Sequence, residues 1–126
     1  MLAAEYIAKG GNDQIILCER GVRSFSGETR FTLDLAGAIW ASQETYLPVI
    51  VDPSHGTGVP ELIAPLTRAA IAAGLDGVMV EVHPTPDHAL SDGDQALTPS
   101  QFETMMTSLA PVAEAVGRTF SRGRDE

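Results

Sequence analysis

The sequence feature that most constrains the fold is a run of β-branched residues that ends in a polar turn. Val-Ile-Val at 49–51 is followed by Asp-Pro-Ser-His-Gly-Thr-Gly at 52–58. β-branched residues favour a strand buried on both faces, and Pro53 has no N–H to donate to a sheet, so the strand should end near it. His55 then lies just past the carboxyl end of a buried strand, where α/β folds bind ligands.

Two other apolar runs end in the same way. Residues 15–18 lead into Glu19 and Arg20, and residues 78–80 lead into Glu81. Strand starts about 30 residues apart, with helical apolar spacing between them, are typical of a parallel sheet. Right-handed crossovers place all the strand ends on one rim. The predicted strands are 14–19, 47–52 and 77–81, and the predicted helices between them are 30–42 and 60–73.

The rest of the chain carries further helix and turn signals. Thr98 and Gln101 form the capping box of a last helix, in which Pro111 should produce a kink or a split. The first residues predict the end of a helix, 1–9, whose apolar face is formed by Leu2, Ala3, Tyr6 and Ile7. The segments without such periodicity are predicted loops at 54–59 and 83–97 and a frayed polar tail at 121–126.

Composition narrows the class of protein. The 126 residues suit one domain, and a 44% hydrophobic content suits a buried core. A formal net charge of −9 argues against nucleic acid and anionic membranes as partners. No apolar run approaches the ~20 residues that cross a bilayer, so we expect an acidic cytoplasmic protein. Cys18, the only cysteine, lies in an apolar run and is interpreted as a small buried residue rather than a nucleophile.

Three side chains can converge on the predicted rim as a metal site. His55, Glu81 and Asp92 offer one imidazole and two carboxylates. This ligand set suits a divalent ion such as Mn²⁺, Fe²⁺ or Zn²⁺. The alternative interpretation is a polar rim of solvated charges without a metal.

Basic and small residues near the same rim suggest anion binding. Arg20 directly follows a strand and Arg23 lies on the same loop, so both could bind planar oxyanions through their guanidinium groups. An ion pair of Arg20 with Glu19 or Glu28 is the alternative. His83 could orient a metal ligand instead of being one. The glycines around Thr57, ahead of a predicted helix, could hold an anion at its N-terminus.

Five sequence words together resemble the carboxyl-terminal part of a known enzyme family. They cover nearly the whole chain, residues 1–120, in the family's order. The family is that of the shorter bacterial 3-deoxy-D-arabino-heptulosonate 7-phosphate (DAHP) synthases, and the related 3-deoxy-octulosonate 8-phosphate synthases match these words less closely. The words are ILCERGVRSF, TRFTLDL, LPVIVDPSHGTG, IAAGLDGVMVEVHP and ALSDGDQALTPSQF.

The resemblance implies a fold, a reaction and roles for single residues. The family folds as a (β/α)₈ barrel and condenses phosphoenolpyruvate with erythrose 4-phosphate, the first step toward the aromatic amino acids, with a divalent metal. Carried onto this chain, it implies that His55, Glu81 and Asp92 are metal ligands. It also implies that Arg20 binds phosphoenolpyruvate and, with His55, serves catalysis.

Departures from the family pattern limit what the chain does alone. It has only the last three of eight βα units. The family's fourth metal ligand, a cysteine near the first strand, is absent, because Cys18 lies in a different sequence motif, CERG. Val59 stands where the family often has a basic residue, and Phe31 stands where it usually has an asparagine. We therefore expect a partial barrel domain at 1–120 and a tail at 121–126, inactive by itself.

The missing strands leave several partners and functions open. The chain could complete its barrel with an amino-terminal half made separately, or associate with further copies of itself. A second possibility is a non-catalytic remnant or regulatory protein that keeps the fold. A third is a self-assembling half-barrel that binds a metal or phosphate.

Overall fold

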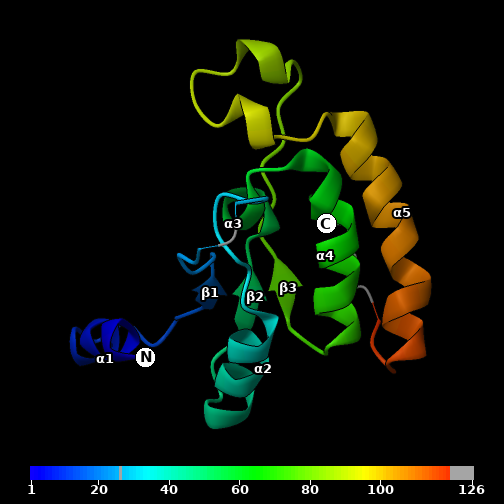
Figure 1. The fold of residues 1–126 in the computed structure, drawn as a ribbon. Coiled ribbons are helices and arrows are strands. Elements are labelled where there is room, and N and C mark those ends of the chain that lie inside the picture. The colour runs from blue at the N-terminus through cyan, green and yellow to red at the C-terminus, as the bar shows by residue number, and fades with distance from the viewer. Residues whose placement is uncertain (26, 120–126) are drawn as a thin grey trace, which may run out of the picture.

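The chain forms one open sheet of parallel strands with helices, which confirms the predicted α/β architecture. The computed structural model describes residues 1–25 and 27–119. The strands lie in the order β1-β2-β3 and all pair in parallel. Figure 1 shows α4 beside β3 with α5 on the outer side of α4, and α1 standing apart beyond β1. The strands are β1 (Leu17–Glu19), β2 (Val49–Val51) and β3 (Gly77–Val78), and the long helices are α1 (Leu2–Lys9), α2 (Leu35–Glu44), α4 (Pro60–Ala72) and α5 (Pro99–Ala115).

The register places the three strand ends beside one another. Val51 in β2 is paired with Glu19 in β1 and with Val78 in β3. The strands are shorter than predicted, although the N–H of Met79 still donates to the Val51 carbonyl at 2.8 Å. The residues that follow each strand therefore all leave the sheet at its carboxyl-terminal end.

One face of the sheet is covered by helices. Val49 and Val51 are almost completely buried, and they form a core with Ala38 of α2 and Ala70 of α4. A second cluster joins Ile63 of α4 to Met105 of α5. Burial of such side chains contributes about 1.5–3 kcal/mol each, so these two clusters hold the helices to the sheet.

The opposite sheet face is largely open. Side chains alternate along a strand, so Ile16, Cys18 and Met79 point away from the helix-covered face. Ile16 is 61% exposed and Met79 is 46% exposed. Cys18 is exposed as well, so the prediction that it is buried is wrong, because burial in an apolar run requires a cover on both faces. Parallel strands are normally covered on both faces, and here one cover is missing.

The turn after β2 is a short helix rather than the predicted loop. Helix α3 (Pro53–Thr57) has Asp52 as its N-cap residue and Pro53 at its first position. It ends at Gly58, whose φ of 69° lies in the left-handed region that favours glycine. An aspartate followed by proline is a helix-start signal, and it outweighs the turn residues that favour a loop.

Two predicted helices differ in detail from those observed. Residues 1–9 do form a helix, but the expected apolar face is exposed, with Leu2 at 74% and Tyr6 at 81%. Helix α2 begins later than predicted, since Asp34 caps it and Val22 pairs with Thr32 in an isolated bridge.

The last helix starts as predicted but does not split. Thr98 and Gln101 form the expected capping box, and α5 continues through Pro111 to Ala115. The buried side chains of Leu109 and Ala113 on either side of the proline hold the helix together. The long loop contains two 3₁₀ turns, η1 (Pro86–His88) and η2 (Gly93–Gln95).

Two expectations concern the ends and surface of the chain. The predicted tail at 121–126 lies outside the described residues. Across the described ranges, no helix is both long enough and apolar enough to span a bilayer.

Candidate functional site

The site is built around a buried aspartate at the end of β2. Asp52 has no exposed surface. Its Oδ1 accepts the backbone N–H of His55 at 3.0 Å, and its Oδ2 lies 2.7 Å from His55 Nδ1. One carboxylate therefore caps α3 and holds the imidazole ring of the same helix.

The other ring nitrogen faces two carboxylates from different segments. His55 Nε2 lies 3.9 Å from Glu81 Oε2 and 3.9 Å from Asp92 Oδ2. The His55 side chain is 13% exposed, and the carboxylate side chains are 39% and 37% exposed. The three residues that the sequence predicted as metal ligands are thus neighbours on one rim, with Asp92 reaching it from the long loop.

The chemistry of these three residues fits a divalent metal around which the side chains would have to close. Metal–ligand bonds of about 2.0–2.2 Å allow two ligand atoms to be at most ~4 Å apart. Across residues 1–25 and 27–119, no three His, Cys, Asp or Glu side chains already surround a common metal position. The two separations of 3.9 Å from His55 Nε2 lie at that limit, so the half-exposed carboxylates of Glu81 and Asp92 need only small side-chain adjustments to share a cation with the ring.

Each carboxylate is anchored through its own backbone segment. The N–H of Glu81 donates to the Oγ of Ser54, a fully buried residue of α3, at 3.0 Å. Asp92 has a φ of 57°, an unfavourable value for a residue with a side chain. Its Oδ1 accepts a hydrogen bond from Gln95 Nε2 at 3.2 Å. Backbone strain of this kind often marks functional sites.

Arg20 reaches the same cluster from the end of β1. Its Nε lies 3.5 Å from Asp52 Oδ2, and its side chain is 60% exposed. Glu19, one of the alternative partners, instead accepts the N–H groups of Gly21 and Asp34. The prediction that Arg20 lies on the rim of His55 and Glu81 is confirmed. Its exposed guanidinium remains accessible to an anion.

Two further arginines flank an aromatic ring on this side of the sheet. The guanidinium carbons of Arg23 and Arg30 lie 5.7 Å and 5.3 Å from the centre of the Phe31 ring. Arg30 Nη1 is also 3.5 Å from the Oε1 of Gln95, which in turn contacts Asp92. The sequence pattern indicated Arg23 but not Arg30, because no local pattern shows that Arg30 reaches a loop 65 residues later.

Two other sequence expectations concern residues near this rim. The ring of His83 accepts the N–H of Thr85 at its Nδ1, whereas the side chain in short contact with the ring of His55 is Asp52. The signal was present as an acidic N-cap three residues before the histidine. The Thr57 hydroxyl donates to the carbonyl of Pro53 inside α3, and an anion at the N-terminus of the following helix stays a prediction. Although Cys18 is exposed on the open sheet face, its thiol is partly shielded by neighbouring residues, and this shielding, followed by the negative charge of Asp52, raises its pKa.

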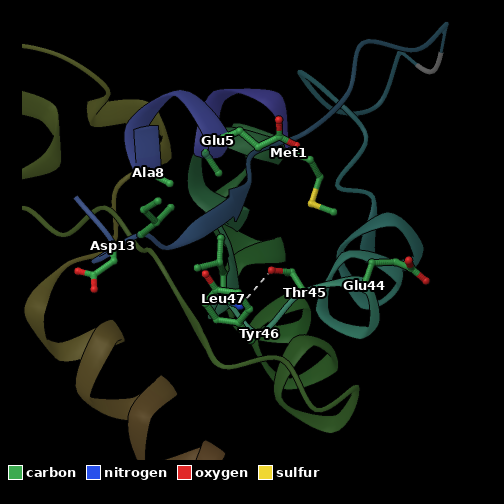
Figure 2. A pocket seen from close by; sticks show the side chains of 10 residues that line it. Met1, Glu5, Ala8, Asp13, Glu44, Thr45, Tyr46 and Leu47 are labelled. Carbon is green, nitrogen blue, oxygen red and sulfur yellow. Dashed lines mark hydrogen bonds between the residues drawn. The ribbon is translucent and has the colours of Figure 1, made fainter. Parts of the chain in front are cut away.

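A separate pocket lies at the opposite ends of the strands. It has a volume of about 210 Å³ and lies between α1 and the segments that precede β1 and β2 (Figure 2). Thr45 and Leu47 are joined there by a hydrogen bond of 3.1 Å. The pocket lies before the strands begin, whereas His55 follows the end of β2, so the pocket is separate from the rim. We assign the functional site to the rim.

Known proteins resemble this chain in sequence and in structure. It is 50% identical over 117 residues to a phospho-2-dehydro-3-deoxyheptonate aldolase of Thermotoga maritima, which covers 93% of this chain and 35% of that protein. It is 36% identical to a 2-dehydro-3-deoxyphosphooctonate aldolase of Desulfotalea psychrophila, over 84% of this chain and 41% of that protein. The chain therefore spans less than half the length of these relatives.

The fold comparison agrees. A crystal structure of the Thermotoga maritima DAHP synthase superposes with a TM-score of 0.91 at 48% identity, covering 95% of this chain and 35% of that one. A truncated form of the same enzyme superposes equally well and is covered to 46%. The profile of the DAHP synthetase I family matches residues 1–117. With that match over nearly its whole length, the chain belongs to the DAHP synthetase I family.

Proposed function

We propose that this chain is the carboxyl-terminal part of a DAHP synthase barrel, which condenses phosphoenolpyruvate with erythrose 4-phosphate. The observation that carries the proposal is the meeting of His55, Glu81 and Asp92 beside Arg20 at the carboxyl end of a parallel sheet. This is the end at which barrel enzymes place their catalytic residues. The relatedness to the Thermotoga maritima enzyme supports the choice of reaction.

The residues divide into a metal-binding group and an anion-binding group. His55 Nε2, Glu81 and Asp92 would hold a divalent metal (Mn, Fe or Zn), which supplies a Lewis acid to polarise the aldehyde oxygen of erythrose 4-phosphate. Arg20 and, further out, Arg23 would bind the charged groups of phosphoenolpyruvate. The third carbon of phosphoenolpyruvate attacks the aldehyde carbon, water adds to the second carbon, and inorganic phosphate leaves.

The proposal includes completion of the barrel by other strands. Strands β1 and β3 are both edges, and the exposed side chains of Ile16 and Met79 need a cover. A separate amino-terminal half-barrel or further copies of the chain could supply it. Of these two, only the amino-terminal half would also supply the fourth metal ligand and the remaining cations, without which we expect no turnover. Loss of substrate alignment alone raises a barrier by ~7–11 kcal/mol.

A second substrate class is supported by the 2-dehydro-3-deoxyphosphooctonate aldolases among the relatives. The two classes differ in product length. Phosphoenolpyruvate contributes three carbons, so a four-carbon aldose phosphate gives the seven-carbon acid and a five-carbon one gives the eight-carbon acid. Mass spectrometry of the product from each aldose phosphate separates them, and we expect the seven-carbon product because of the 50% identity to the heptonate enzyme.

The test measures phosphate release from phosphoenolpyruvate and erythrose 4-phosphate with Mn²⁺. The chain is assayed alone and with the amino-terminal part of the Thermotoga maritima relative. We expect activity only in the mixture, and its loss with His55→Ala. The matched control is His88→Ala, because His88 is exposed on η1 and belongs to neither the metal-binding nor the anion-binding group. Phosphate release by the chain alone would contradict the need for added strands, and inactivity in both settings would favour a non-catalytic remnant.

A further inference from the structure

We propose that Asp52 is a positioning residue that fixes the tautomer of His55 and at the same time aims Arg20. A single buried carboxylate would then set both the metal-binding and the anion-binding side of the site. The inference rests on the proposed function, which assigns a metal to His55 and an anionic substrate to Arg20. The tautomer itself can be tested without either.

The two oxygens of Asp52 have separate tasks. Oδ1 is used by the backbone N–H of His55, which fixes α3 relative to β2. Oδ2 faces the ring nitrogen Nδ1 of the same histidine at 2.7 Å and the Nε of Arg20 at 3.5 Å. Because Asp52 is fully buried and the His55 side chain is only 13% exposed, water has little access to the contact between them, and the ring depends on this one side chain.

An ionised carboxylate only accepts hydrogen bonds. The short contact to Oδ2 therefore places the ring proton on Nδ1, and the lone pair is left on Nε2. Nε2 is the atom that faces Glu81 and Asp92 at 3.9 Å. A metal ligand needs that lone pair, so the tautomer decides whether His55 can join the two carboxylates around a cation.

Asp52→Asn separates this role from a merely structural one. An amide has only one acceptor oxygen. The backbone N–H of His55, which now donates to Oδ1 of Asp52, requires that oxygen. The amide NH₂ then faces the ring and donates to Nδ1, so the ring proton moves to Nε2. The opposite amide orientation would set NH₂ against a backbone N–H in a buried place, and this costs about 1–3 kcal/mol. The variant keeps the cap of α3 but replaces the Nε2 lone pair with a donor N–H.

The chain offers a matched control in a second helix-capping aspartate. Asp34 Oδ1 accepts the N–H of Gly37 at 2.8 Å and caps α2 as Asp52 caps α3. No histidine is among the partners that the structure gives for the Asp34 side chain. Asp34→Asn makes the same chemical change at a cap and should leave the ring of His55 unaffected.

The primary readout is the ¹⁵N NMR spectrum of the imidazole ring, recorded on the full chain where the ring is neutral. We expect the Nδ1–H tautomer of His55 in the wild type and in Asp34→Asn, and the Nε2–H tautomer in Asp52→Asn. The proposal is overturned if the wild type has its proton on Nε2 or if Asp52→Asn leaves the tautomer unchanged. Thermal melts of the two variants report whether each keeps its fold, and Asp52→Glu provides a second acceptor-only carboxylate if the asparagine variant does not fold.

Calorimetric titration with Mn²⁺ alone tests the consequence. Loss of a group that orients a ligand weakens metal binding by about 10- to 100-fold, so we expect this for Asp52→Asn and not for Asp34→Asn. Equal Mn²⁺ affinity in Asp52→Asn and the wild type would overturn the positioning role. Absence of Mn²⁺ binding by the wild type, together with the expected tautomer change, would instead reject the metal side of the proposed function and leave the assignment of Asp52 to the ring intact.

Discussion

The backbone N–H of Glu81 donates to the Oγ of Ser54, so the end of β3 is attached to the short helix that follows β2. Both Ser54 and its neighbour Asp52 are fully buried. Two residues of one turn thus position His55, Arg20 and the segment of Glu81.

Ser54→Ala should therefore destabilise the chain and displace Glu81. The substitution leaves a half-buried N–H without its acceptor, and we expect a loss of about 1–3 kcal/mol in the free energy of unfolding, measured by urea denaturation. Ser42→Ala is the control, because the Ser42 hydroxyl only donates to a carbonyl of its own helix, that of Ile39. Equal losses for the two variants would show that the Ser54 contact has no special weight.

Gly21→Ala should disturb the loop that carries Arg20. Gly21 has a φ of 96°, and a Cβ there would lie 2.7 Å from Phe31 Cβ and 3.1 Å from Gly56 Cα. Gly11 has a similar φ of 89° but open space around it. Gly11→Ala should show only the backbone cost of about 1–2 kcal/mol, and Gly21→Ala clearly more. Chemical denaturation compares them, and equal effects would mean that the loop yields without cost.

Arg20→Ala should weaken phosphoenolpyruvate binding in a completed barrel. Hydrogen bonds to charged groups contribute about 1.5–3 kcal/mol, so we expect roughly a 10- to 100-fold rise in the dissociation constant, measured by calorimetry. Arg68→Ala serves as the control, because Arg68 contacts Ser108 between α4 and α5. Unchanged binding in Arg20→Ala would remove this residue from the site.

The open sheet face should make the chain self-associate in dilute solution. Light scattering should report species larger than a monomer, and replacing Ile16 and Met79 together by serine should reduce association. Leu90→Ser is the matched control, because Leu90 is fully exposed on the long loop rather than on the sheet. A monodisperse monomer with a cooperative melt would contradict this prediction.

Asp76 should make part of the stability depend on pH. Its pKa is lowered, mainly by the hydrogen bond from the Val49 N–H and further by Arg118, against an opposing effect of burial. A lowered folded-state pKa stabilises the fold above the ordinary carboxyl pKa, and this contribution disappears as the pH falls through the folded value. Urea denaturation should show a deficit of Asp76→Asn relative to wild type at pH 7 that shrinks toward pH 3. A constant deficit would reject the linkage.

Much of the fold follows from local sequence patterns. The three parallel strands, the capping box at Thr98 and the convergence of His55, Glu81 and Asp92 on one rim were all predicted. Runs of β-branched residues and turn residues are local signals, and the right-handed crossover rule places the strand ends together. The Asp-Pro signal for α3 is present in the sequence too. Pro53 also ends strand β2, and because a proline after a strand equally indicates a turn, the sequence alone did not predict helix α3.

Tertiary structure alone decided which surfaces are covered and which partners each charge finds. Cys18 and the apolar side of α1 are exposed because burial depends on neighbours that a single segment does not contain. The pairing of Arg20 with Asp52 and the reach of Arg30 to Gln95 join segments far apart in the chain. A sequence pattern fixes the direction in which a side chain leaves the backbone, whereas the contact it makes depends on what the folded chain brings within a few ångströms.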